Sequence, residues 1–212
     1  MPGSTRSGLT GPWAAEQRSN DVGRKVGVLA LQGAFREHAQ VLDCLGAHPV
    51  ELRTPGDLAA VDALVLPGGE STTMSLLLAS SGLFSAVADA LAAGMPTLAT
   101  CAGLILLATT VRGGRADQRS FGVLDVAVER NGYGRQIDSF ESSLAVADLG
   151  DEPFPAVFIR APLISSTGAA VTVMATVDDR PVLVRQGHLL AATFHPELSG
   201  DLRLHQLFLG GS

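Results

Sequence analysis

Residues 63–110 read ALVLPGGESTTMSLLLASSGLFSAVADALAAGMPTLATCAGLILLATT, and this stretch decides the fold class. The short apolar runs Ala63–Leu66 and Thr97–Ala99 are typical of buried strands. The segments between and after them predict helices at 71–80, 83–93 and 103–110. Buried strands that alternate with helices indicate a parallel sheet with right-handed crossover connections.

The rest of the chain extends this pattern in both directions. Toward the N-terminus, Val26–Leu31 predicts another buried strand, and residues 34–45 predict a helix that stops at Gly46. Beyond a polar segment at 111–120 several strands are predicted in close succession, with a hairpin turn at Asp178-Asp179. These strands lie at 123–128, 156–160, 170–177, 181–186 and 189–194, and a last helix is predicted at 201–209. We therefore expect an α/β fold with a mostly parallel central sheet, helices on both faces and a small antiparallel annex.

Length and composition fit one folded domain. The chain has 212 residues, of which 46% are hydrophobic and 17% charged, so it can bury a sizeable core. Residues 1–24 lack periodicity and any apolar block of the signal-peptide kind. We expect a flexible N-terminal extension there, a single domain at 25–212 and a cytoplasmic location. The apolar stretch 83–111 is broken by Gly94-Met95-Pro96, so each half is too short to span a bilayer.

Charge and cysteine content exclude several classes of protein. The formal net charge of −6 argues against a nucleic-acid-binding surface. Lys25 is the only lysine among 15 basic residues, which excludes a Gly-Lys-Ser/Thr phosphate loop. Two cysteines cannot form a disulfide scaffold or a four-cysteine zinc site, and they fit a reducing compartment. Of the two, we expect Cys44 to be a structural residue on the apolar face of its helix.

Cys101 occupies a position suited to a nucleophile. It lies between Ala99-Thr100 and Ala102-Gly103, at the junction of a predicted strand and a predicted helix. Small neighbours are what a sharp strand-to-helix turn requires. The dipole and free N–H groups of a helix N-terminus favour a thiolate over a thiol. Taken alone, Cys101 can equally be interpreted as a buried structural cysteine.

Two other loops at strand ends carry complementary groups. In Phe194-His195-Pro196-Glu197 the carboxylate of Glu197 can orient the imidazole of His195. In Pro67-Gly68-Gly69-Glu70 the N–H groups of the two glycines could form an oxyanion hole. Taken alone, each loop is also compatible with an ordinary turn or a surface histidine. For the remaining histidines we expect no role in the site; they are His38, His48, His188 and His205.

The three loops together are stronger evidence for a catalytic site than any one of them alone. Sites in open α/β sheets lie at the carboxyl ends of the strands. A thiol, a histidine with its carboxylate and a Gly-Gly donor loop at three such ends are the parts of an acyl-transfer site. The sequence therefore predicts an enzyme with a cysteine nucleophile.

These motifs resemble those of the class I, or triad, glutamine amidotransferases. More narrowly, the chain is similar to the glutaminase subunits of pyridoxal 5′-phosphate synthases over about residues 25–208. The segments that carry this resemblance are Gly27–Gly33, Pro67–Met74, Thr100–Ile105, Glu129–Asn131 with Gly134–Gln136, Ser139–Glu141, Phe158–Pro162 and Phe194–Leu198. The loop at 112–119 matches nothing in that pattern, and we expect it to be solvated and mobile.

The resemblance implies a flavodoxin-like fold and hydrolysis of L-glutamine to L-glutamate and ammonia. It assigns Cys101 as the nucleophile, His195 as the general base and Glu197 as the carboxylate that orients it. It also places the N–H groups of Gly69 and Ala102 in the oxyanion hole. The glutamine-binding residues that it implies are Gly68, Gly69, Glu70, Arg130, Ile159 and Arg160. The charges fit, because the α-carboxylate and α-ammonium groups of glutamine need a cation and an anion, which Arg130 or Arg160 with Glu70 can supply.

The resemblance implies a protein partner but no cofactor and no metal. Because Lys25 is a poor candidate for carbonyl chemistry, ring building is expected on a separate synthase subunit that receives the ammonia. The family implies a large hetero-oligomer with equal numbers of the two subunits, twelve of each, and no nucleic-acid or membrane partner. It further implies that docking reorients a peptide in the Gly68-Gly69 loop. Two alternatives stay open: a glutaminase subunit of another amidotransferase, such as imidazole glycerol phosphate synthase, and a non-catalytic binding module of the same fold.

Overall fold

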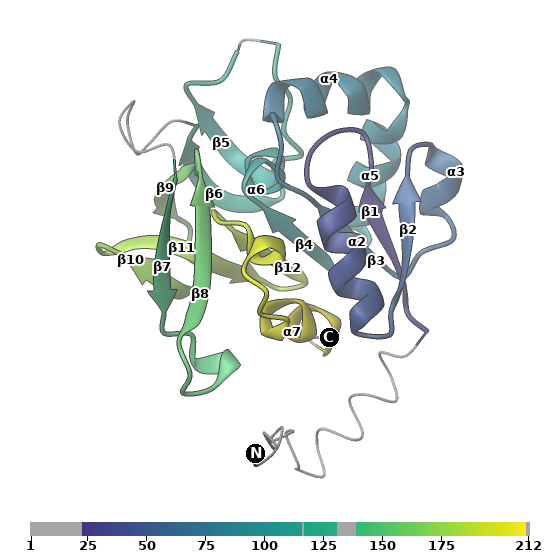
Figure 1. Ribbon diagram of the computed structural model, residues 1–212. Coiled ribbons are helices and arrows are strands. Elements are labelled where there is room, and N and C mark those ends of the chain that lie inside the picture. The colour runs from purple at the N-terminus through teal and green to yellow at the C-terminus, as the bar shows by residue number, and fades with distance from the viewer. Residues whose placement is uncertain (1–22, 116, 131–138, 211–212) are drawn as a thin grey trace, which may run out of the picture.

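The computed structural model describes residues 23–115, 117–130 and 139–210 of the chain. A seven-stranded sheet forms its centre (Figure 1). The strands are β1 (Lys25–Leu29), β2 (His48–Leu52), β3 (Ala63–Leu66), β4 (Thr97–Thr100), β10 (Thr172–Val177), β11 (Arg180–Gln186) and β12 (Leu189–Ala192). Their order is β10-β11-β12-β4-β3-β1-β2. The five strands from β12 to β2 run parallel, and β10 and β11 add an antiparallel edge.

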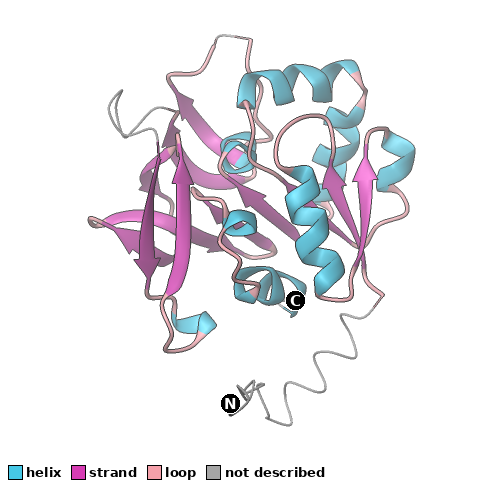
Figure 2. Cartoon of the chain, viewed as in Figure 1, coloured by secondary structure: helices cyan, strands magenta, loops and turns pink. Residues whose placement is uncertain are grey.

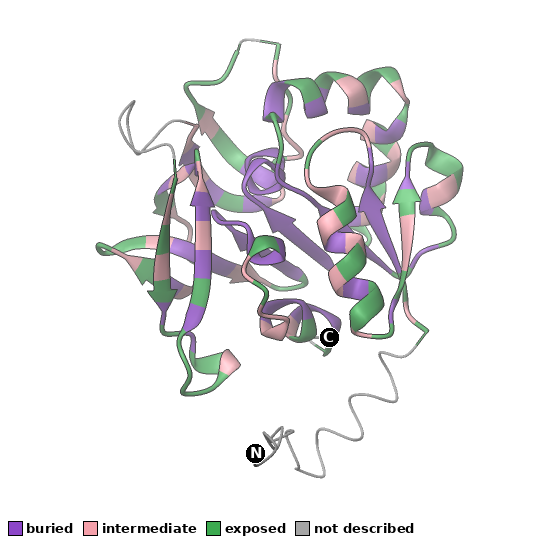
Figure 3. Cartoon of the chain, viewed as in Figure 1, coloured by how far each residue is buried: buried purple, intermediate pink, exposed green. Residues whose placement is uncertain are grey.

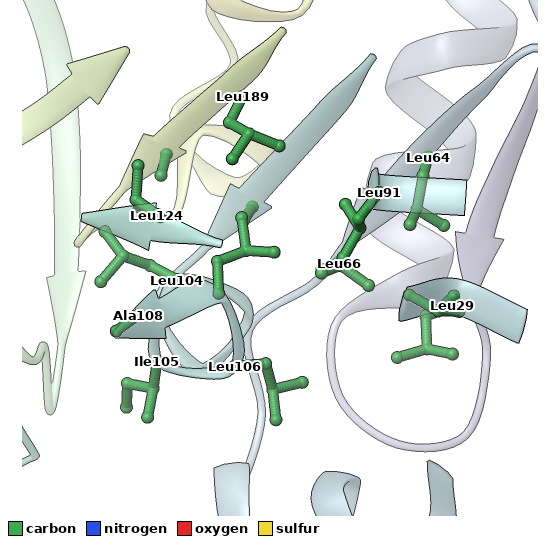
Figure 4. Close-up of a cluster of buried hydrophobic side chains, with 14 of the residues drawn as sticks. Leu29, Leu64, Leu66, Leu91, Leu104, Ile105, Leu106, Ala108, Leu124 and Leu189 are labelled. Carbon is green, nitrogen blue, oxygen red and sulfur yellow. The ribbon is translucent and has the colours of Figure 1, made fainter. Parts of the chain in front are cut away.

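Helices cover both faces of this sheet. Those of one face are α4 (Ser71–Ser80), α5 (Leu83–Ala92) and α6 (Ala102–Leu107), and those of the other are α2 (Phe35–Cys44) and α7 (Arg203–Gly210). Alternation along β3 explains the two layers, because successive side chains of a strand point to opposite faces. Leu64 and Leu66 pack with Leu91 of α5 (Figure 4), whereas Ala63 and Val65 belong to the core on the side of α2 and α7. The predicted mostly parallel α/β fold is therefore confirmed.

The inner strands are buried on both faces, as their continuous apolar sequences predict. All four residues of β3, β4 and β12 are buried, whereas the edge strand β2 is largely accessible (Figure 3). The site loops that follow β3, β4 and β12 are therefore attached to fully buried strands of the sheet.

The predicted annex consists of two small sheets (Figure 2). One contains β5 (Ala108–Arg112), β6 (Leu124–Glu129) and β9 (Leu163–Thr167), in the order β5-β6-β9. The other is the antiparallel pair of β7 (Ser139–Leu144) and β8 (Phe154–Ile159). Strands β10 and β11 belong instead to the central sheet, and the predicted turn at Asp178-Asp179 joins them with positive φ angles of 49° and 59°. Such angles are typical of a two-residue hairpin turn.

Some element boundaries differ from the predicted ones. The helix predicted at 103–110 ends at Leu107, because the β-branched residues Thr109, Thr110 and Val111 continue as β5 and pair with β6. A short helix, α3 (Pro55–Leu58), was not predicted; it begins with a capping box between Thr54 and Asp57. Strands β7 and β9 were not predicted, since both are rich in Ser and lack a continuous apolar run.

Several expectations concern other parts of the chain. Residues 1–22 of the predicted extension lie outside the described residues, as do Asn131 and Gly134–Gln136 of the family-like segments. Cys44 is exposed at the end of α2, so its placement on the apolar face was wrong. In the described ranges no helix is both long and apolar enough to cross a membrane alone; α4 and α5 meet that criterion only as a pair, bent by 100°.

Candidate active site

Cys101 occupies a sharp elbow between β4 and α6. Its backbone has φ 48° and ψ −104°, a left-handed conformation that non-glycine residues rarely adopt. The turn is tight because α6 packs directly on β3: a Cβ at Gly103 would overlap the carbonyl group of Leu66. The amide of Cys101 donates to the carbonyl of Ala192 in β12 at 2.8 Å. Strain held by such surroundings is common at catalytic positions.

His195 reaches Cys101 from the neighbouring strand. β12 lies parallel to β4, with Ala192 opposite Thr100, so the chain after each strand emerges at the same edge of the sheet. The His195 amide donates to the carbonyl of Val157 in β8 at 2.8 Å. Its ring forms a side-chain hydrogen bond with Cys101, and Nδ1 lies 2.7 Å from Oε1 of Glu197. Because Nδ1 is committed to Glu197, Nε2 is the nitrogen that faces the sulfur.

Electrostatics favour a charged imidazole and a charged carboxylate. Burial alone would lower the pKa of His195, but its hydrogen bonds with Cys101 and Glu197 raise that pKa to about 10. Burial alone would raise the pKa of Glu197, but the facing rings of His38 and His195 hold it below the usual value. At neutral pH His195 is thus an imidazolium between a sulfur and an anion.

The Gly68-Gly69 loop lies against the imidazole. A Cβ at Gly68 would overlap the His195 ring, and a Cβ at Gly69 would overlap the amide oxygen of Gln32. The carbonyl of Gly68 accepts a hydrogen bond from the Ala34 amide at 3.0 Å. Only glycine leaves room for this close approach of backbone to ring.

Glu70 and Arg130 form a preassembled ion pair next to this loop. The Glu70 carboxylate caps α4, accepting from the amides of Thr72 at 3.1 Å and Thr73 at 2.7 Å. Arg130 donates to the same carboxylate at 2.5 Å and to the Thr72 hydroxyl at 2.9 Å. Burial opposes ionisation of Glu70, but the hydrogen bonds from Thr73 and Thr72 and the charge of Arg130 lower its pKa to about 2. The cation and anion are therefore fixed relative to each other.

Three other expected site residues are Ile159, Ala102 and Arg160. The Ile159 carbonyl lies 3.9 Å from Cys101 Sγ. Ala102, the first residue of α6, is buried directly after the nucleophile. Arg160 is exposed with φ 44°, and its side chain makes no hydrogen bond or ion pair with the described part of the protein.

The 112–119 loop does not fit the expectation of a purely solvated segment. Its Gln118 side chain bonds to Ser71 and Thr72, both at 3.2 Å, and the Arg119 amide bonds to Ser75 at 2.8 Å. The Arg119 guanidinium lies 3.8 Å from the centre of the Phe84 ring. The second half of this loop is therefore fixed to the start of α4, beside Glu70.

Two histidines with no expected role lie behind the candidate triad. His38 of α2 and His205 of α7 are fully buried, and His38 Nε2 is 3.2 Å from Glu197 Oε2. These two are therefore not surface histidines, whereas His48 and His188 are exposed. The detectable signal was the position of His38 four residues before Leu42, on the apolar face of a helix. Among the residues that the structure describes, no group of three or more His, Cys, Asp or Glu side chains could hold a metal ion.

Known proteins provide an independent comparison. The pyridoxal 5'-phosphate synthase subunit PdxT of Frankia casuarinae is 54% identical over 187 residues, which cover 88% of this chain and 94% of that protein. PdxT of Deinococcus radiodurans is 55% identical over 188 residues, with coverage of 87% and 95%. A crystal structure described as a glutamine amidotransferase aligns with a TM-score of 0.81 at 47% identity, covering 88% of this chain and 99% of that chain.

The comparison of family models agrees with these relatives and with the predicted flavodoxin-like fold. The model of the SNO glutamine amidotransferase family matches residues 28–211. That match includes the central sheet except for residues 25–27 of β1, and it includes the Cys101 elbow and the His195-Glu197 segment. The chain therefore belongs to the SNO glutamine amidotransferase family.

Proposed function

We propose that this chain is the glutaminase subunit of a pyridoxal 5′-phosphate synthase and hydrolyses L-glutamine to L-glutamate and ammonia. The observation that carries the proposal is the buried row of Cys101, His195 and Glu197 at the carboxyl ends of β4 and β12. Nucleophile, proton carrier and orienting carboxylate are the groups that amide hydrolysis needs. Relatives that bear the name of this synthase subunit favour it over the imidazole glycerol phosphate synthase alternative.

The first half of the reaction forms a thioester. The Cys101 thiolate attacks the side-chain amide carbon of glutamine, and the carbonyl oxygen becomes an oxyanion. The N–H groups of Ala102 and Gly69 stabilise that oxyanion, and one such donor typically lowers the barrier by about 2.7–4 kcal/mol. The His195 imidazolium gives its Nε2 proton to the amide nitrogen, the C–N bond breaks, and ammonia leaves.

The second half returns the enzyme to its starting state. Neutral His195 removes a proton from a water molecule, which attacks the γ-glutamyl thioester. The C–S bond breaks, glutamate is released and the Cys101 thiolate is restored beside the imidazolium. Glu197 stays deprotonated throughout and accepts the hydrogen bond from Nδ1 of His195.

Glutamine is recognised by charges at the mouth of the site. Arg130 and Glu70 are already paired, so both ends of the amino acid zwitterion meet a fixed partner. Arg160 is exposed and free to turn toward the α-carboxylate, and the Ile159 carbonyl faces the sulfur. Because Gly68 has no side chain, its loop lies directly against the His195 ring.

The ammonia is passed to a synthase subunit, in a complex of twelve copies of each chain. Ammonia released into water would be protonated and would lose its nucleophilicity, so transfer needs a protected route. Docking of the synthase reorients the Gly68–Gly69 peptide, which breaks the hydrogen bond between Ala34 and Gly68. We place this complex in the cytoplasm, because an uncombined thiol nucleophile needs a reducing compartment.

The test is glutamate release from glutamine, measured with and without the matching synthase. We expect weak release from the chain alone and strong stimulation by the synthase. The C101A variant should release no glutamate, while C44A, which removes the exposed thiol, should behave like wild type. Unchanged release by C101A would remove the enzyme mechanism. Stimulation by a different synthase, but not by the pyridoxal phosphate synthase, would reassign the partner.

A further inference from the structure

A buried row of imidazoles extends from the candidate triad to helices α2 and α7. His38 Nδ1 lies 2.9 Å from His205 Nε2, and His38 Nε2 lies 3.1 Å from the Thr100 hydroxyl and 3.2 Å from Glu197 Oε2. The row therefore runs from α7 through α2 and Glu197 to His195 and the sulfur. α2 and α7 lie close together on the same face of the sheet (Figure 1).

The network fixes where each proton lies. A carboxylate oxygen only accepts, so it would repel a lone pair on the His38 nitrogen that faces it at 3.2 Å. We therefore place the hydrogen on that nitrogen, from which it can also reach the Thr100 hydroxyl. The neutral His38 ring then accepts at Nδ1, which requires His205 to donate from Nε2. The atom left over is His205 Nδ1, and it is buried without a hydrogen-bond partner in the described part of the chain. In this arrangement His205 Nδ1 carries a lone pair, so no N–H group is buried without an acceptor.

Both rings are held neutral. Burial lowers the pKa of His38; among its facing groups Glu197 raises it, His195 lowers it and Glu37 of the same helix raises it, and the net direction is down. Burial and then the His38 ring lower the pKa of His205 to about 3. No imidazolium competes with His195 for the Glu197 carboxylate at neutral pH.

Packing alone does not explain these side chains. On α2 the other buried side chain is Leu42, and on α7 the neighbours include Leu204 and Phe208. Two imidazoles in such an apolar layer are costly to desolvate compared with leucines of similar size. Glu197 Oε2, by contrast, is fully buried and has no hydrogen-bond partner among the described residues. The polar group that faces this oxygen is Nε2 of the His38 ring, at 3.2 Å.

We propose that His38 is a positioning residue for the glutaminase reaction, which keeps Glu197 ionised and oriented, and that His205 fixes the ring and tautomer of His38. The proposal rests on the proposed function for its kinetic consequences but not for its proton arrangement. Removing His38 leaves a buried carboxylate with one partner, and Glu197 then takes up a proton or turns away from His195.

The kinetic test uses H38L, H38Q and H205L in the complex with the synthase, assayed for glutamate release from pH 5 to 9. We expect kcat of H38L to fall about ten- to hundredfold, the loss expected when a buried charged group loses a facing polar partner, with KM nearly unchanged. The acid limb of its pH profile should move to higher pH. H38Q retains an N–H donor at a similar reach and should recover most of kcat, and H205L should show a smaller loss.

The matched control is L42A, which removes the other buried side chain of α2. It should lower stability but leave kcat and the pH profile of the folded enzyme unchanged. If H38L and L42A have the same kcat and the same profile, His38 acts only as a core residue and the proposal is wrong.

A second measurement does not depend on activity or on the folding of any variant. In wild-type protein with ¹⁵N-labelled histidine, the NMR signals of His38 and His205 should show the neutral Nε2–H tautomer at pH 7 to 8. An Nδ1–H tautomer or an imidazolium at His38 would overturn the proposal. A wild-type complex that shows the expected tautomers but releases no glutamate would instead contradict the proposed function.

Discussion

The amide of Cys101 donates a hydrogen bond of 2.8 Å to the carbonyl of Ala192, which joins the elbow of the candidate nucleophile to the end of β12. His195 follows only three residues later, so the separation of sulfur and imidazole is set by the register of two parallel strands. Groups that are held by regular elements keep a more accurate geometry than groups that depend on long loops. The geometry and electrostatics of the whole site lead to four predictions.

Replacing Glu197 with glutamine should reduce catalysis far more than substrate binding. E197Q keeps the shape of the side chain but removes the charge that stabilises the His195 imidazolium. We expect kcat for glutamate release to fall by about 10³–10⁴-fold, with KM changed little, because Glu197 is buried behind His195. The control is E51Q, which removes one partner of an exposed ion pair with Arg53. A fall of less than tenfold in E197Q would contradict the role of the carboxylate.

Gly33 should tolerate no side chain, for a reason that Gly94 does not share. Both have positive φ angles, +93° and +87°, so an alanine at either position should lower the free energy of unfolding by about 1–2 kcal/mol. Only at Gly33 would the new Cβ overlap the Gly68 carbonyl, next to His195; the Cβ at Gly94 would meet open space. G33A should therefore lose additional stability in urea unfolding and also lose kcat/KM, while G94A keeps normal activity. Equal losses in both variants would show that the contact with Gly68 is unimportant.

Stability should pass through a maximum near pH 6.5. The lowered pKa values of His38 and His205 mean that the unfolded chain binds more protons below that pH, so the free energy of unfolding falls as the pH drops from about 6.5 to 5. The pKa of His195, raised to about 10, has the opposite effect: its contribution is complete below pH 6.5 and is lost as the pH rises through 10. Urea unfolding from pH 5 to 10 measures both limbs. The exposed His188 provides the control, since H188N should leave the curve unchanged, and a curve that rises steadily to pH 9 would contradict the assignment.

Loss of Arg130 should weaken glutamine binding without unfolding the protein. R130A removes a cation that contacts Glu70 and Thr72, and we expect KM for glutamine to rise about ten- to hundredfold with a smaller change in kcat. Stability should change by no more than about 1 kcal/mol, because the pair is partly exposed. R112A is the matched control, since its ion pair with Glu129 is exposed and 3.8 Å long. An unchanged KM in R130A would assign Arg130 to capping α4 through Glu70 alone.

Much of the central fold could be predicted from local sequence. The apolar run Ala63–Leu66 and the helices predicted at 71–80 and 83–93 match the structure to within one residue, since burial on both faces and helical composition are visible within a few residues. Strands β7 and β9 could not be predicted, because their Ser-rich sequences are stabilised by pairing with β8 and β6 rather than by their own pattern.

The chemical groups of the candidate site could be predicted from the sequence, but the long-range contacts that hold them in place could not. Small residues around Cys101, the spacing of His195 and Glu197, and the two glycines after β3 each reflect a local requirement for space or for a short reach. The pairing of Arg130 with Glu70 and the anchoring of Gln118 join segments that are distant in the chain. No local pattern encodes such contacts.

The sequence by itself determined most strands and helices of the central sheet and which residue types stand at the strand ends, because these depend on periodicity and on the space that a turn allows. Only the tertiary structure decided that β12 lies beside β4, that Cys101 meets His195, and that His38 and His205 are buried behind Glu197. Those outcomes depend on strand order and on the packing of α2 against α7, which are properties of the whole chain. A histidine on a helix has the same local sequence whether it faces water or a carboxylate, and its partner becomes defined only when the layers assemble.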